Sequence, residues 1–220
     1  MIKKFLINFI KESPRLLFCV KYVLSKLRQI NSKSKWNALK KTSEIKLELG
    51  SGPKKGKDGW TTVDIGSSMH TADISWDLRR GIPLSNESVM KIYSSHLLEH
   101  IPYEQLLKFL QDCQRVLKSE GVFLVCVPSF RIYIDAYKKG QMFRSRDTWW
   151  QPGVINTGSC IDQLNYMAYM KDEHKYMFDE ENLINTLLKA GFSSAKLRAF
   201  DPHLDLKERD YESIYAEAYK

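Results

Sequence analysis

The segment that most constrains the fold is IKLELGSGPKKGKDGWTTVDI, residues 45–65. Residues 45–49 form a short, largely apolar run typical of a buried strand, and a Gly-Ser-Gly turn follows them. A second strand is predicted at residues 60–65, with Asp64 near its end. In open α/β sheets, ligands lie at the carboxyl ends of the strands, where a glycine turn lets the backbone approach closely. We therefore expect a ligand site where Gly50 and Gly52 meet Asp64.

The glycine spacing in this segment disfavours NAD or FAD as the ligand. A dinucleotide-binding loop would have its third glycine at position 55, where this chain has lysine. The connection from Gly50 to Trp60 is also short for a parallel crossover. It leaves little room for the helix on whose N-terminus a dinucleotide pyrophosphate rests. A Gly-x-Gly pair alone is also compatible with a plain turn at the end of a strand.

The rest of the chain alternates between strand and helix patterns. Strands alternating with helices predict an α/β sheet covered by helices on both faces. Further strands are predicted at residues 71–78, 89–95, 121–128, 194–200 and 211–219, and helices at residues 103–117 and 179–190. Asp179 is expected to cap the helix of residues 179–190, and Gly191 to end it.

The basic charge is concentrated at the front of the chain. Residues 1–57 contain 15 of the 34 Lys and Arg residues but 3 of the 26 Asp and Glu residues, so the remainder is slightly acidic. At 220 residues the chain is long enough for one sizeable domain. We therefore divide it into a basic helical extension, residues 1–43, and a domain, residues 44–220.

Residues 1–30 mix aliphatic side chains with Lys and Arg at roughly helical spacing. The longest apolar run is too short to cross a bilayer. One interpretation is an amphipathic helix on the anionic inner face of a membrane. The alternative is a helix packed on the domain or against a second copy in a homodimer.

The four cysteines show no close clustering, which is typical of reduced thiols in a cytoplasmic protein. No histidine lies at metal-ligand spacing from a cysteine, so no metal is expected.

Two later motifs join the glycine turn. One predicted strand runs into SWDL, which contains Asp77, and another runs into YSSHLLEHI. In this order, the pieces resemble class I S-adenosylmethionine-dependent methyltransferases, in particular a group that often serves bacterial polysaccharide and other glycan pathways. The resemblance covers about residues 45–128 and resumes more weakly at residues 174–192 and 212–220. It implies a Rossmann-like sheet, mostly parallel with an antiparallel C-terminal strand, and S-adenosylmethionine as the cofactor.

The resemblance also implies roles for individual residues at the cofactor. Asp64 would hold the ribose hydroxyls, and Asp77 with the backbone of Leu78 would read the adenine edge. The loop of residues 53–59 departs from the family pattern and truncates the first crossover. The implied cofactor-binding residues are Glu48, Gly50, Ser51, Gly52, Asp64, Asp77, Leu78 and Ser95.

A hydroxyl acceptor needs a group that removes its proton, such as His, Asp or Glu within hydrogen-bond reach. His96 is the first candidate, because it follows the predicted strand 89–95, and Glu99 and His100 come next. The spacing of His96 and His100 would also suit a structural hydrogen bond or a pair of metal ligands, but no third ligand is evident.

Acceptor recognition is expected in residues 129–178, a long insertion between a strand and the next helix. Its aromatic residues suit stacking on sugars, and its basic residues suit a phosphate or carboxylate. The same aromatic residues also fit a helix packed on the core. The candidates chosen for substrate binding are Tyr133, Arg146, Trp149, Trp150 and His174, with Arg131, Tyr137, Arg144, Tyr166 and Tyr169 as further members of the set.

These observations favour methylation of a hydroxyl on a small molecule or glycan. The basic front end raises the alternative of a nucleic-acid methyltransferase, which the slightly acidic remainder disfavours. A third hypothesis is a scaffold protein that retains the fold without turnover.

Overall fold

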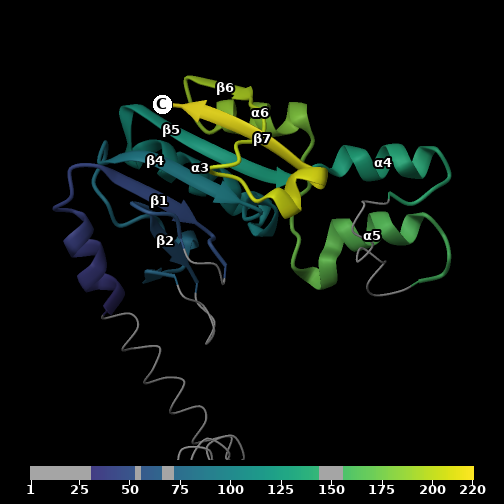
Figure 1. The fold of residues 1–220 in the computed structure, drawn as a ribbon, viewed down its shortest axis with the longest axis horizontal. Helices are drawn as coiled ribbons and strands as arrows, with labels where there is room; N and C mark the ends of the chain where they lie inside the picture. The colour runs from purple at the N-terminus through teal and green to yellow at the C-terminus, as the bar shows by residue number, and fades with distance from the viewer. Residues whose placement is uncertain (1–30, 53–55, 66–71, 144–155) are drawn as a thin grey trace, which may run out of the picture.

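The computed structural model describes residues 31–52, 56–65, 72–143 and 156–220. Its centre is a seven-stranded sheet in the order β3-β2-β1-β4-β5-β7-β6 (Figure 1). The strands are β1 (Ile45–Leu49), β2 (Thr61–Asp64), β3 (Ile74–Ser75), β4 (Val89–Ser95), β5 (Leu117–Pro128), β6 (Ser194–Leu197) and β7 (Ser213–Tyr219).

The sheet is parallel except at its C-terminal part. β1 pairs in parallel with both β2 and β4, and the parallel pairing continues to β3 on one side and β5 on the other. β7 runs antiparallel to β5 and β6. This confirms the predicted Rossmann-like, mostly parallel sheet with an antiparallel C-terminal strand. The strand order reverses between β1 and β4, which is the switch point where such sheets bind ligands.

Helices α3 (Tyr103–Val116) and α6 (Glu180–Lys189) pack against each other and against this sheet. α6 begins after Asp179, whose side chain accepts a hydrogen bond from the backbone N–H of Asn182. It ends before Gly191, which has a φ of 101°. The predicted cap and stop of this helix are confirmed.

Two further helices, α4 (Phe130–Lys138) and α5 (Ile161–Tyr169), lie side by side beyond the carboxyl end of β5 (Figure 1). The side chain of Gln163 bonds both backbone groups of Phe143, at 2.7 and 2.8 Å, and so fastens α5 to the segment after α4. We call residues 130–143 and 156–172 the α4–α5 lobe. It occupies most of the described part of the predicted acceptor insertion.

Residues 31–39 form a helix that packs on the β3 edge of the sheet. Trp36 is 2% exposed, belongs to the same hydrophobic core as β1, and meets Trp76 edge to face at 6.1 Å. The hydroxyl of Ser32 donates to the carbonyl of Ser75 at 2.8 Å. The described end of the predicted N-terminal extension is therefore packed on the domain, whereas residues 1–30 lie outside the described residues.

Some predicted boundaries differ from the structure. Within the strand predicted at residues 71–78, only Ile74–Ser75 forms a described strand, because Asp77 caps the short 3-10 helix η1 (Leu78–Arg80). The strand predicted at 121–128 starts four residues earlier, at Leu117. Among the described residues, no helix combines the length and apolarity that crossing a membrane requires.

Candidate functional site

The turn after β1 strongly favours glycine at its first position. Gly50 has a φ of 72°, and a Cβ placed on it would lie 2.9 Å from the Cβ of Leu97. Its N–H donates to the carbonyl of Val63 at 2.8 Å, and the N–H of Gly52 donates to Asp64 Oδ2 at 2.9 Å. The structure therefore brings the predicted glycine turn and Asp64 together, as the strand order requires.

Ser51 lies between these glycines and has a polar atom without a partner. Its Oγ is buried and makes no hydrogen bond within the described part of the chain. Most buried polar atoms have a hydrogen-bond partner, so Ser51 Oγ has the capacity to bond a ligand at this turn. The side chain of Glu48, on β1, reaches the loop that follows this turn, because a Cβ on Gly56 would be 3.8 Å from its Oε2. The turn therefore offers a compact, polar place for a ligand that approaches the backbone closely.

Asp77 lies after β3 and is engaged locally. Its carboxylate accepts from the backbone N–H of Arg79 at 3.1 Å and forms an ion pair with the Arg79 guanidinium at 2.9 Å. The hydrogen bond from the Arg79 side chain holds the pKa of Asp77 below its ordinary value. Leu78 is buried beside it. The predicted adenine-reading pair thus lies at the same strand-end edge, with the carboxylate already bonded by Arg79.

β4 ends at Ser95, and His96 follows with a left-handed backbone. The φ of His96 is 52°, and its N–H donates to the carbonyl of Cys126 at 2.9 Å. Residues other than glycine rarely have a positive φ, and those that do cluster at functional sites. Arg209 Nη1 lies 3.3 Å from the Ser95 carbonyl and 3.4 Å from its Oγ.

The hydrogen bonds of Ser213 determine the tautomer of His96. The Ser213 hydroxyl donates to the Arg209 carbonyl at 2.7 Å, so it acts as acceptor for His96 Nε2 at 2.9 Å. Nε2 therefore carries the proton and Nδ1 carries the free lone pair. Burial, followed by the charge of Arg209, lowers the pKa of His96 well below its ordinary value, so the ring is neutral.

Glu99 is the most unusual group at this edge. Its side chain is 3% exposed, lies on the 3-10 helix η2 (Leu98–His100), and neither carboxylate oxygen has a hydrogen-bond partner among the described residues. Oε1 lies 3.7 Å from His96 Nδ1 and 3.8 Å from His100 Nε2. Burial raises the pKa of Glu99 to about 8.

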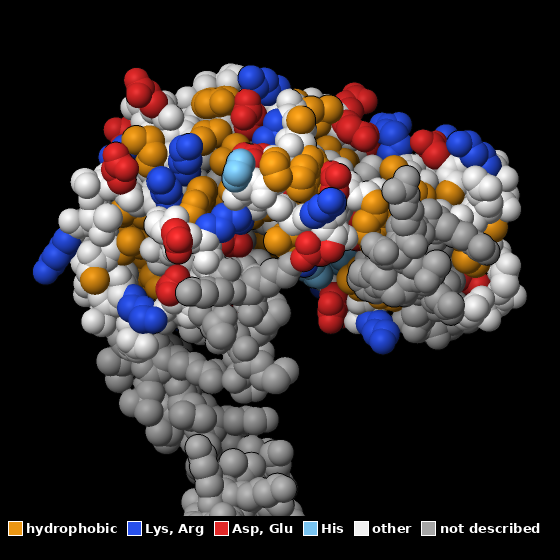
Figure 2. All heavy atoms as spheres, in the orientation of Figure 1, with side chains coloured by type: hydrophobic (Ala, Val, Ile, Leu, Met, Phe, Trp, Pro, Cys, Tyr) orange, Lys and Arg blue, Asp and Glu red, His pale blue; other side chains and the backbone are white. Residues whose placement is uncertain are grey.

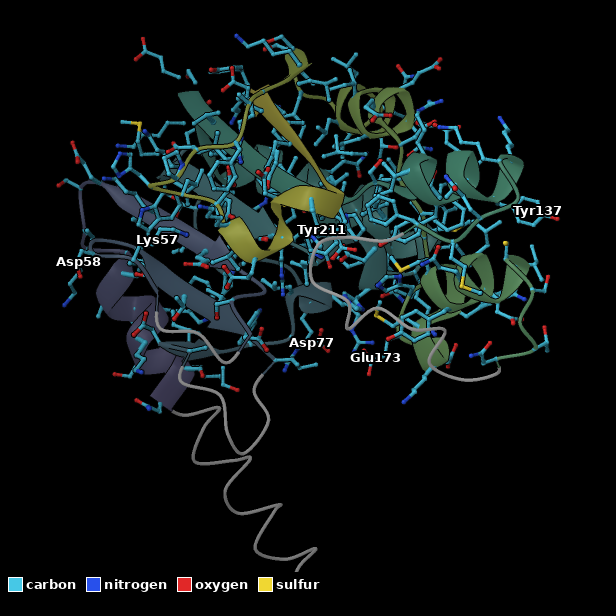
Figure 3. The ribbon with its side chains drawn as sticks, turned by 45° about the vertical axis from the view of Figure 1, so that its right-hand side comes forward. Lys57, Asp58, Asp77, Tyr137, Glu173 and Tyr211 are labelled. Atoms are coloured by element: carbon cyan, nitrogen blue, oxygen red, sulfur yellow. The ribbon has the colours of Figure 1, made fainter. Side chains whose placement is uncertain are left out.

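His174, which is distant in sequence, lies beside His100. Its ring lies 4.9 Å from that of His100, at an angle of 74°. The backbone N–H groups of Lys175 and Tyr176 donate to the Glu99 carbonyl at 2.7 and 3.2 Å. The segment that follows the short helix η3 (Met170–Asp172) is thereby fastened to η2. Figure 3 shows Glu173 of this segment at the lower end of the α4–α5 lobe.

The remaining acceptor-side candidates are dispersed. Tyr133 is 1% exposed, and its hydroxyl donates to Glu212 Oε2 at 2.6 Å, so its side chain lies in the core. Arg131 pairs with carboxylates at the start of α6. Tyr137 and Tyr169 are exposed on the α4–α5 lobe, and Figure 3 shows Tyr137 at its outer end. The predicted residues outside the described part of the chain are Arg144, Arg146, Trp149 and Trp150.

Sequence reasoning missed two residues of this edge, Arg209 and Ser213. Arg209 belongs to the 3-10 helix η4 (Lys207–Glu212), which lies in front of the sheet with Tyr211 in Figure 3. No local signal marks either residue, because both reach Ser95 and His96 only through the antiparallel pairing of β7 with β5. In the view of Figure 2, basic and acidic side chains are intermixed over this described face.

A family model described as "Methyltransferase domain" matches residues 60–125. No curated protein sequence matches the chain significantly.

Solved structures with the same fold include an S-adenosylmethionine-dependent methyltransferase from Mesorhizobium loti. It is 16% identical, with a TM-score of 0.50 over 84% of this chain and 97% of that one. Another is a complex from Haloferax volcanii between a methyltransferase activator and a proposed methyltransferase, 12% identical, with a TM-score of 0.50 over 89% of this chain and 92% of that one. The chain therefore has the fold of these methyltransferases, and its residues 60–125 are similar to a methyltransferase domain.

Proposed function

We propose that this chain, a methyltransferase by its domain match and its fold, transfers the methyl group of S-adenosylmethionine to a hydroxyl of a small-molecule or glycan acceptor. S-adenosylmethionine is the methyl donor that this fold serves. The observation that carries the proposal is the turn after β1. There Gly50 leaves room beside Leu97, and the buried Ser51 Oγ lacks a partner within the described residues.

The residues at this turn fit the chemistry of the cofactor. Glu48 and Ser51 would border its methionine end, where the amino and carboxylate groups need polar partners. Asp64 would accept hydrogen bonds from the ribose hydroxyls, as acids at the end of the second strand do in related nucleotide sites. Asp77 and the backbone of Leu78 would read the adenine edge.

When bound, S-adenosylmethionine supplies an electrophilic methyl group, so positioning of the acceptor contributes much of the rate. His96 would take the proton of the acceptor hydroxyl on Nδ1, the nitrogen left free by the bond to Ser213. The carboxyl of Glu99 lies 3.7 Å from this nitrogen and would border the proton as it is transferred. Ser95, the last residue of β4, directly precedes this base.

A glycan acceptor is supported by the resemblance in sequence and by aromatic surface on the α4–α5 lobe. Tyr169 is 65% exposed and Tyr137 is 45% exposed, and such rings suit the faces of sugars. A place in polysaccharide biosynthesis would follow from an acceptor of this class. The basic residues 1–30 support contact with the anionic inner face of a membrane, where lipid-linked sugars are found. A homodimer remains a prediction.

The proposal is tested by incubating the purified protein with methyl-labelled S-adenosylmethionine and a panel of acceptors. The panel contains nucleotide sugars, lipid-linked sugars, small phenols and amines, and a short RNA. We expect label on a sugar hydroxyl, located by fragmentation in the mass spectrometer, and loss of labelling with His96→Ala. Labelling of RNA or amines alone would contradict the proposal that the acceptor is a hydroxyl of a small molecule or glycan.

A further inference from the structure

Three potential metal ligands converge beside the proposed catalytic edge. Glu99 and His100 belong to η2, and His174 follows η3, far along the chain. One ligand atom from each of these three residues lies within 4.8 Å of the others, and His100 Nε2 is 3.8 Å from Glu99 Oε1. The third ligand that the sequence does not reveal is therefore supplied by the fold.

Both histidines are oriented as metal ligands are. His100 Nδ1 donates to the carbonyl of Glu173 at 3.1 Å, and His174 Nδ1 donates to the carbonyl of Met167 at 2.6 Å. Each bond leaves the lone pair on Nε2. Histidines that bind metals almost always donate their other ring nitrogen to a carbonyl or carboxylate in this way, which fixes the tautomer and the ring.

Glu99 provides an independent observation that points to a cation. Its side chain is 3% exposed, and both oxygens lack hydrogen bonds among the described residues. A buried carboxylate without partners is costly, so such a group either holds a proton or binds a cation. The charge of Arg209 acts on the Glu99 carboxyl, but Arg209 Nη1 is directed to Ser95. Glu212 is also held elsewhere, by the hydroxyl of Tyr133.

We propose that Glu99, His100 and His174 bind a divalent transition-metal ion that also takes the acceptor hydroxyl as a ligand. Two imidazoles and one carboxylate suit zinc, iron, cobalt or manganese, whereas magnesium prefers oxygen ligands alone. Metal–ligand bonds of about 2.0–2.2 Å place ligand atoms about 3.5 Å apart in a tetrahedral complex, so the site contracts slightly on binding. Three protein ligands leave a coordination position open, as in catalytic metal sites.

The open position would lie next to His96, whose Nδ1 is 3.7 Å from Glu99 Oε1. His100 keeps 35% of its side chain exposed, so this side of the site is open to an entering acceptor. A metal-bound hydroxyl loses its proton more readily. The proton would pass to His96 Nδ1 while the oxygen–carbon bond forms and the carbon–sulfur bond of the donor breaks. This role of the metal rests on the proposed methyltransferase function, but the site itself does not.

The test uses the full-length, untagged protein after removal of metals with a chelator. Calorimetric titrations with zinc and cobalt are compared with magnesium, and the visible absorption of bound cobalt reports its ligands. We expect one equivalent of zinc or cobalt to bind, with weak or no binding of magnesium. Glu99→Gln and His174→Ala should each weaken zinc binding at least tenfold, and His203→Ala, at an exposed histidine, should leave it unchanged.

Circular dichroism of each variant shows whether it is folded, and Glu99→Gln preserves the shape of the side chain. Absence of stoichiometric zinc or cobalt binding would overturn the proposal, as would unchanged affinity in both ligand variants. Binding of S-adenosylmethionine is measured separately on metal-free protein. Cofactor binding without metal binding would refute the metal site alone. Metal binding without cofactor binding would instead refute the methyltransferase function and leave the site standing.

Discussion

His96 Nε2 lies 2.9 Å from Ser213 Oγ, and the hydroxyl proton of Ser213 is committed to the carbonyl of Arg209. This places the ring proton of His96 on Nε2 and leaves Nδ1 free to accept one. The residue that orients the proposed base therefore comes from the start of β7, on the antiparallel side of the sheet.

Replacing Ser213 with alanine should lower turnover about tenfold without changing the affinity for the cofactor, because the tautomer of His96 is no longer held. The kcat, its pH profile and the dissociation constant of S-adenosylmethionine are measured together. Ser193→Ala, at an exposed serine near the far end of β7, is the matched control. If kcat and its pH profile matched the wild type, Ser213 would have no orienting role.

Glu99 should make the stability of the metal-free protein depend on pH. Burial raises its pKa from an ordinary 4.5 to about 8, so between these values the folded state holds a proton that the unfolded state releases. The contribution of Glu99 is therefore fully present below pH 4.5 and is lost as the pH rises through 8. Glu99→Gln should flatten the decline in the free energy of unfolding across this window.

The measurement is urea denaturation at several pH values in the presence of a chelator. Glu104→Gln, at an exposed position on α3, is the control and should decline as the wild type does. An equal decline in the wild type and in Glu99→Gln would show that another group is responsible.

Gly50→Ala should disrupt the turn for two reasons. The φ of 72° disfavours a side chain, and the new Cβ would lie 2.9 Å from Leu97. Gly140 isolates the first reason, because its φ of 68° is similar but its Cβ would have no neighbour within 4 Å. We expect Gly140→Ala to cost about 1 kcal/mol of unfolding free energy, and Gly50→Ala about 2 kcal/mol or more together with weaker cofactor binding. Equal losses in the two variants would argue against the contact with Leu97.

Trp36→Ala should destabilise the domain by about 3–5 kcal/mol, because it removes a large buried side chain from the core. Chemical denaturation measures the loss, and Lys33→Ala, at an exposed position on the same helix, is the control. A loss below about 1 kcal/mol would show that the helix of residues 31–39 contributes little to the folded domain.

The fold could be predicted further than the site. The bounds of β1 and β4 match those read from the sequence, because each is a compact apolar run between turn residues. By contrast, residues 130–138 were expected only as part of an insertion, and they form α4. The meeting of His174 with Glu99 and of Ser213 with His96 depends on tertiary packing, so no local pattern reveals either pair.

Binding of S-adenosylmethionine at the turn after β1 is measured by calorimetric titration of the purified protein with the cofactor. The wild type should bind the cofactor and its demethylated product with micromolar affinity. Asp64→Asn, which removes the charge at the proposed ribose contact, should weaken both at least tenfold. Absence of binding by the folded wild-type protein would show that the turn after β1 is not a site for S-adenosylmethionine.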